Sequence, residues 1–85
     1  MSGHEWTMVV SIVGAAITMA AGAVGAAIGE GRIAAAAMDA LARQPDEAGS
    51  ITRTLFVSLA MVESTAIFCL VISLILLFAN PFAGA

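Results

Sequence analysis

Two long apolar stretches, joined by a short polar segment, dominate the pattern of the chain. The first runs from about Trp6 to Gly29 without a charged residue and can continue as helix through the segment RIAAAAMDALA. The second runs from about Thr54 to Ala79, and its one charged residue is Glu63. A bilayer core about 30 Å thick requires about 20 helical residues. Each stretch is therefore predicted to be a membrane-spanning helix.

The polar segment ARQPDEAGS, residues 42–50, predicts a turn between the two helices. Pro45 disfavours helical backbone at Gln44, the residue before it. Asp46 and Glu47 follow, and acids are favourable in the first turn of a helix because they complement its dipole. We therefore expect these two acids to lie in the first turn of the second helix.

The simplest fold is an all-α helical hairpin. Backbone groups in lipid must be satisfied within the protein, and two helices with a hydrated turn satisfy them. Asn80-Pro81 is expected to end the second helix, because proline cannot continue the hydrogen-bond ladder. The predicted boundaries within a single unit of residues 1–85 are helix 1 at about 6–42, the turn at about 43–47 and helix 2 at about 48–79.

Composition supports a membrane protein. Hydrophobic residues make up 61% of the chain and charged residues 11%, against roughly 25% charged residues in soluble domains. The net charge of −3, without a basic patch, argues against nucleic-acid binding. Cys69 is the one cysteine, so no disulfide or cysteine-based metal framework is possible. The acidic N-terminal segment MSGHEWT has no Lys or Arg, unlike a secretory signal peptide.

The arginines predict the orientation in the membrane. Arg32, Arg43 and Arg53 are the chain's basic residues, and all three flank or occupy the polar segment. Positive charge is retained on the cytoplasmic side, so the turn is expected in the cytoplasm and both termini on the opposite side. Trp6 and Phe82 then fall near the outer interface, where aromatic rings are favoured.

The segment AAGAVGAAIGEG, residues 20–31, consists almost entirely of Ala and Gly. Glycine lowers helix propensity, whereas small residues let helices approach closely in a membrane. Nearly every face of this segment is small, which favours neighbouring helices on several sides, with Gly25, Gly29 and Gly31 as packing positions. Packing of helix 1 on helix 2 alone would require only one small face, and this simpler interpretation stays open.

Glu30 and Glu63 are the two acids in apolar surroundings, and counting places them at similar depth. The midpoint between positions 30 and 63 lies in the polar segment, and each acid is about 16 residues, or about 25 Å of helix, from the fold point. Ser64 and Thr65 follow Glu63. Carboxylate and hydroxyl oxygens suit a hard cation such as Na⁺, and they equally suit a bound proton. The alternative is a pair of protonated acids that only fixes the hairpin, or one acid that snorkels to the surface.

Four segments of the chain resemble the c subunit of F-type rotary ATP synthases, the proteolipid of the membrane rotor ring. The turn ARQPD resembles the loop signature of that family, and the small residues ending in GEG resemble its glycine-rich inner helix. VEST, residues 62–65, resembles the ion-binding segment of the outer helix, and LILLFANPF resembles its C-terminal end. The resemblance covers nearly the whole chain.

The resemblance implies a closed ring of identical hairpins in the bacterial inner membrane, with helix 1 inside and helix 2 facing lipid. Glu63 would carry the ion, loading from a channel in the stator a subunit. The turn residues Arg43, Gln44 and Pro45 would contact the central stalk. The chain itself would catalyse no bond-making and would need no cofactor.

The ion that the resemblance implies is H⁺ or Na⁺. Sodium-coupled members of the family have Gln or Glu at the position of Glu30, a carboxylate at Glu63 and hydroxyls next to it, which allows Na⁺ at Glu30, Glu63 and Ser64. Paired acids are also similar to the N-type branch. Phe68, however, stands where sodium-coupled members have a tyrosine whose hydroxyl holds the carboxylate. H⁺ is therefore favoured.

Two other classes use small membrane hairpins. A small multidrug or ion exporter also uses an intramembrane Glu, but it has more spans and aromatic residues along its cavity. A pore-forming hairpin usually has a charged tail, whereas this chain ends in ANPFAGA. Both remain alternatives to the rotor-ring protein.

Overall fold

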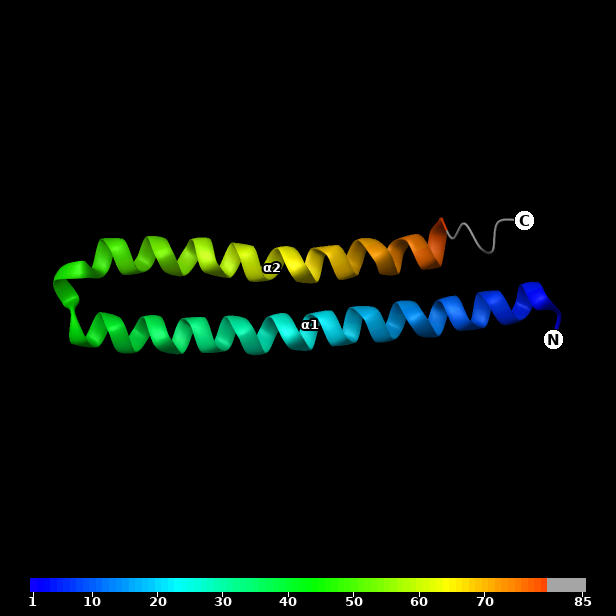
Figure 1. The fold of residues 1–85 in the computed structure, drawn as a ribbon, viewed down its shortest axis with the longest axis horizontal. Helices are drawn as coiled ribbons and strands as arrows, with labels where there is room; N and C mark the ends of the chain where they lie inside the picture. Colours follow the sequence, from blue (N-terminus) through cyan, green and yellow to red (C-terminus); the bar gives the residue numbers. More distant parts are fainter. Residues whose placement is uncertain (80–85) are drawn as a thin grey trace.

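A computed structural model confirms the helical hairpin (Figure 1). It describes residues 1–79, and the positions Asn80-Pro81 and Phe82 singled out above lie outside this range. Helix α1 spans Gly3–Arg43, a 3₁₀ turn η1 spans Pro45–Glu47, and helix α2 spans Ala48–Phe78. The two helices lie side by side and antiparallel, with the turn at one end of a rod of 64 × 16 × 10 Å.

Helix α1 begins three residues before Trp6 because Ser2 and Glu5 form a capping box. The Glu5 N–H donates to Ser2 Oγ, and the Ser2 N–H donates to the Glu5 carboxylate, each over 3.2 Å. Ser and Glu three residues apart are the sequence signature of this cap. The sequence therefore contains the signal for the true start of the helix.

The turn follows from Pro45. Gln44 leaves the helical region with φ −134° and ψ 70°, as the proline after it predicted. Pro45 then opens the 3₁₀ turn, in which the Glu47 N–H donates to the Gln44 carbonyl over 3.0 Å. The prediction that Asp46 and Glu47 lie in the first turn of helix 2 is wrong. Both acids belong to η1, because the proline starts a tight turn of its own before α2 begins.

Three buried alanines follow one another at intervals of eleven residues along α1. Ala15, Ala26 and Ala37 are buried on α1. On α2, the buried residues are Ala66 and Ser73, seven residues apart. Eleven residues in three turns give 3.67 residues per turn, close to the 3.6 of an ideal α-helix. The buried stripe of α1 therefore stays on one face of that helix, and α2 packs along it.

Among the glycines of residues 1–79, Gly22 is the one packed most tightly against α2. A Cβ atom on Gly22 would lie 2.6 Å from Cys69 Sγ and 2.7 Å from Cys69 Cβ, so the position has room for glycine alone. Further along, the Ser73 hydroxyl donates to the Ala15 carbonyl over 3.0 Å within the buried interface. Because a buried side-chain hydrogen bond is directional, this contact fixes the register of α2 on α1.

Both helices are long and apolar enough to cross a membrane. Paired in an antiparallel hairpin, they make the chain an integral membrane protein. Their most apolar 18-residue windows have mean hydropathies of 2.0 and 2.4. The large apolar side chains, such as Phe56, Met61 and Phe78, are exposed on the hairpin. A single hairpin therefore leaves most of its large apolar side chains exposed.

Replacing Gly22 by Ala is expected to destabilise the protein by about 1–3 kcal/mol, since the added methyl group overpacks the interface with Cys69. The measurement is the free energy of unfolding of the purified protein in detergent. Gly49→Ala is the matched control, because a Cβ at Gly49 meets nothing within 4 Å. Equal stability of the Gly22 and Gly49 variants would show that the close approach is not there.

Candidate ion-binding site

The carboxyl groups of Glu30 on α1 and Glu63 on α2 meet within the hairpin. They lie within hydrogen-bonding reach of each other, so either acid, when protonated, can donate to the other. Their equal distance from the turn predicted that the two acids lie at similar depth. The contact between Gly29 and Val62, where a Cβ on the glycine would lie 3.5 Å from the valine side chain, holds the backbones together next to the acids.

The acid pair is placed away from both ends of the rod. Glu63 lies about 12 Å of helix from Leu55 on the turn side and about 22 Å from Phe78 on the other side, at 1.5 Å per residue. Both intervening segments are uncharged. Glu30 is half-buried and Glu63 is exposed on the single hairpin. In a bilayer, an ionised carboxylate at such a position is costly and marks a functional site.

The hydroxyls of Ser64 and Thr65 do not join the acids within one hairpin. Successive helical residues are about 100° apart, so Thr65 lies about 200° around α2 from Glu63. The Ser64 hydroxyl donates to the Ala60 carbonyl of its own helix over 2.9 Å. Of the proposed Na⁺ ligands, the structure therefore brings together Glu30 and Glu63 and leaves Ser64 on another side of α2.

The three small residues predicted to pack helices divide into two kinds. Gly29 faces α2 through its contact with Val62, whereas a Cβ on Gly25 or Gly31 would meet nothing within 4 Å. Gly25 and Gly31 are therefore open for contact with another molecule.

Gly22, the glycine packed most tightly against α2, was not predicted from the sequence. It lies midway between the buried Ser11 and the half-buried Ile33, so it continues an eleven-residue spacing along α1. That spacing is the sequence signal that could have marked Gly22 as an interface position. It is hard to recognise because many of the residues around Gly22 are also small.

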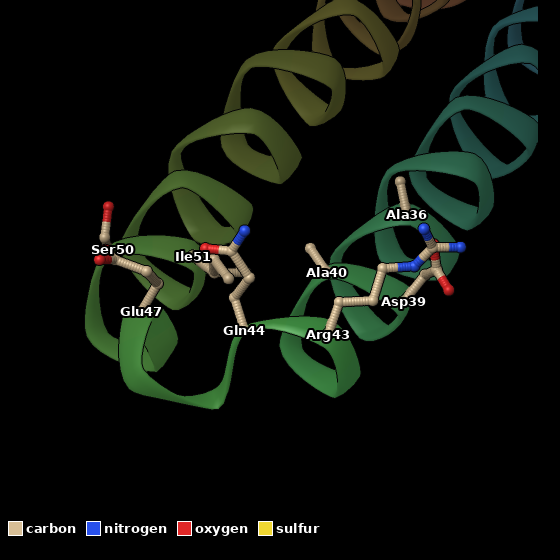
Figure 2. Close-up of a pocket in the computed structure, with 8 residues that line it drawn as sticks. All are labelled: Ala36, Asp39, Ala40, Arg43, Gln44, Glu47, Ser50 and Ile51. Carbon is tan, nitrogen blue, oxygen red and sulfur yellow. The ribbon is translucent and has the colours of Figure 1, made fainter.

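The turn carries a second polar feature, a groove of about 520 Å³ between the end of α1 and the start of α2. Figure 2 shows Arg43 running back along α1 toward Asp39, while Gln44, Glu47 and Ser50 border the other side. Arg43 Nε lies 3.2 Å from Asp39 Oδ2, and both side chains are exposed. An exposed pair contributes at most about 1 kcal/mol, so the Arg43 side chain can be released to a partner at low cost.

Comparison with known proteins supports the resemblance found in the sequence. The family model for the C subunit of ATP synthase matches residues 13–76. The chain is 60% identical to ATP synthase c subunit 2 of Cereibacter sphaeroides, over 94% of this chain and 96% of that protein. It is 46% identical to the ATP synthase c subunit of a Synechococcus species, over 94% and 98%. A third relative, the ATP synthase c subunit of Gloeobacter violaceus, is 45% identical over 95% and 99%.

Cysteines at positions 30 and 63 are expected to cross-link within one hairpin, because the native side chains meet. The test replaces Cys69 by Ala, introduces Glu30→Cys with Glu63→Cys, and treats the protein in membranes with a short bifunctional thiol reagent. After denaturation, a monomer that carries one reagent molecule bound at both ends, identified by its mass, measures the intramolecular link. The control pair Glu30→Cys with Ser64→Cys is expected to give little intramolecular product, and comparable yields from both pairs would contradict the geometry.

Proposed function

The chain belongs to the family of ATP synthase c subunits, whose two-helix hairpins form a ring, and on this premise we propose that it is the rotor protein that carries H⁺ across the membrane on Glu63. Movement of the ion onto and off each hairpin would couple ion flow to rotation of the ring, and thereby to synthesis or hydrolysis of ATP by other subunits. The observation that carries the proposal is the meeting of Glu63 with Glu30 inside a membrane-spanning hairpin.

The physical chemistry of Glu63 suits a carrier. A charged side chain at the centre of a bilayer costs about 3 kcal/mol or more, so the side chain travels past lipid in its neutral form. Beside a hydrated channel the charged form becomes accessible and the ion is released. Residues 54–79 contain no Lys or Arg, and Arg53 is ten residues, or about 15 Å of helix, from Glu63, so no cation on α2 holds Glu63 permanently ionised.

Three features of the sequence and the site support H⁺ over Na⁺. Phe68 has no hydroxyl to hold the Glu63 carboxylate in a coordinating geometry. Ser64 faces away from the acid pair and donates to Ala60. Two protons neutralise both acids, whereas one Na⁺ leaves the second acid dependent on a proton. The proposed site therefore consists of Glu63 and Glu30, with Thr65 of the adjacent hairpin as a candidate further contact across the ring.

The proposed partners follow from the surfaces of the hairpin. Gly25 and Gly31 are open small positions on α1, which suits packing against identical hairpins. The exposed apolar side of α2 suits lipid and the stator a subunit. Arg43, Gln44 and Pro45 at the turn suit contact with the central stalk. In this arrangement the turn is cytoplasmic, the membrane is the bacterial inner membrane, and the chain is not itself catalytic.

Replacing Glu63 by Gln is expected to abolish ion-coupled rotation and leave the ring assembled. The amide is nearly isosteric with the acid, but it can neither release a proton nor carry charge. ATP-driven ion pumping by the whole complex in vesicles is the measurement, and the ring mass verifies assembly. Replacement of the exposed Glu5 by Gln, far from the pair, is the control. Pumping retained in the Glu63 variant would exclude Glu63 as the carrier.

Na⁺ is expected to leave the labelling of Glu63 by carbodiimide unchanged at fixed pH and ionic strength, because the reagent reacts only with the protonated acid and the proposed site binds H⁺. The labelling rate of the assembled ring in increasing NaCl, compared with KCl, is the measurement. Repeating it in Glu30→Gln removes the coupling between the two acids. Saturable protection by Na⁺ and not by K⁺ in the native ring would identify a sodium carrier instead.

A further inference from the structure

The two flanks of helix α1, on either side of the stripe that packs on α2, carry opposite charges. Ala26 belongs to that buried stripe, and each helical residue adds about 100° around the axis. Glu30 follows Ala26 by four residues and lies about 40° to one side of it. Arg32 follows Ala26 by six residues and lies about 120° to the other side. The Arg32 side chain is therefore directed away from the acid pair of its own hairpin.

Grooves between the two helices show that both acids lie on the same flank of the hairpin. Met19 and Leu70 line one groove together. Met19 precedes Glu30 by eleven residues, and Leu70 follows Glu63 by seven. Either spacing returns a side chain to nearly the same side of a helix. Glu30 and Glu63 therefore share the flank of this groove, which we call the acid flank.

Arg32 lies on the opposite flank, together with Thr65. Arg43 lines the groove at the turn, and Thr54 lines the groove that adjoins it. Arg43 follows Arg32 by eleven residues, and Thr65 follows Thr54 by eleven, so each pair shares one side of its helix. The second flank, which we call the arginine flank, therefore presents a guanidinium and a hydroxyl near the depth at which the acid flank presents two carboxyl groups.

Arg32 carries a permanent charge that has no partner within the hairpin. Its guanidinium stays protonated in proteins, and its Cα lies only about 3 Å along the axis from that of Glu30. Across residues 1–79 of the structure, the Arg32 side chain makes no hydrogen bond and no ion pair. Asp39 is about 10 Å further along the helix and is paired with Arg43. Because charged groups within a membrane pair with one another, Arg32 requires a carboxylate from outside the hairpin.

We propose that Arg32 of each hairpin forms an ion pair with Glu30 of the adjacent hairpin in the ring. A closed ring of identical copies is built from head-to-tail contacts, in which one flank of each copy packs on the opposite flank of the next. The arginine flank of one hairpin therefore meets the acid flank of its neighbour, with the opposite charges at nearly one depth. The inference rests on the proposed function, because the contact exists only in the assembled ring.

Glu30 is the partner of Arg32 because the two acids differ in position and in task. Glu30 is half-buried and lies on α1, as Arg32 does, whereas Glu63 is exposed on α2. Glu63 gains and loses the ion, and a permanent counter-ion would hold it charged. An ionised Glu30 accepts a hydrogen bond from protonated Glu63. The guanidinium then replaces the second proton of the acid pair, the three groups together are neutral, and each hairpin carries one ion. Phe68, without a hydroxyl, still favours H⁺ at Glu63.

The first test measures how much assembled ring each variant forms, by native mass spectrometry of the protein purified in detergent. Glu30→Gln leaves the guanidinium of the neighbour buried and unpaired, so the yield of ring is expected to fall at least about tenfold. Adding Arg32→Gln to Glu30→Gln removes the unpaired charge and is expected to restore the ring. Adding Arg53→Gln instead is the matched control, because it removes a charge of the same sign near the turn, and it is expected to restore nothing.

The second test counts the protonated carboxyl groups in the ring by infrared spectroscopy, since protonated and ionised carboxyl groups absorb at different frequencies. Native and Arg32→Lys rings at neutral pH without Na⁺ are expected to show one protonated group per hairpin, that of Glu63. Arg32→Gln rings are expected to show two, because Glu30 without its counter-ion takes up a proton. A purely structural role of Arg32 would leave this number unchanged.

Three results would overturn the inference. They are an undiminished yield of ring in Glu30→Gln, a diminished yield that Arg32→Gln does not restore, and two protonated carboxyl groups per hairpin in the native ring. Each of them, obtained with a native ring that pumps ions and loses pumping in Glu63→Gln, contradicts only the ion pair. A native chain that forms no ring, or that pumps without Glu63, contradicts the proposed function instead.

Discussion

The close approach of the two helix backbones determines the rest of the structure. Glycine at position 22 admits the Cys69 side chain at a separation that no other residue would allow, and the Ser73 hydroxyl fixes the register through the Ala15 carbonyl. Shifting one helix by a single residue would rotate its acid by about 100°, away from the other acid. The meeting of Glu30 and Glu63 is therefore a consequence of how the small residues are spaced along the interface, and the chemistry of the pair depends on that packing.

The sequence predicts the hairpin and the acid pair because both depend on features that a linear pattern contains. The length of the two apolar stretches predicts the membrane-spanning helices, and Pro45 predicts the turn. Equal distance from the turn places Glu30 and Glu63 at the same depth. The apolar pattern places the start of α1 too late because the capping residues Ser2 and Glu5 precede the apolar stretch. Gly22 is not predicted because the segment contains many small residues, and composition alone does not show which of them packs most tightly against α2. Only the position of the partner side chain, Cys69, shows which glycine is indispensable.

A single hairpin holds only part of the site that the sequence suggested. The motif VEST places three polar residues in succession, yet helical geometry directs Glu63, Ser64 and Thr65 to three different sides. Candidate ligands that are adjacent in the sequence, such as Glu63, Ser64 and Thr65, therefore do not form a cluster in one hairpin. In a ring of identical hairpins, the side that carries Glu63 on one copy faces a different side of the next copy. Completing the coordination of an ion would then be a property of the assembly.

The position of Arg32 relative to Glu30 has the same origin in helix geometry. An arginine three or four residues after Glu30 would lie on the same face and form an ion pair with it, and that pair would form within a single hairpin. At two residues, the cation is directed to the other flank of α1 and stays clear of the acid pair of its own hairpin. The same helix can thus direct the acid Glu30 toward α2 and the cation Arg32 to its opposite side at nearly the same depth. This separation leaves Glu63 and Glu30 to each other within the hairpin, and it leaves Arg32 to an adjacent copy.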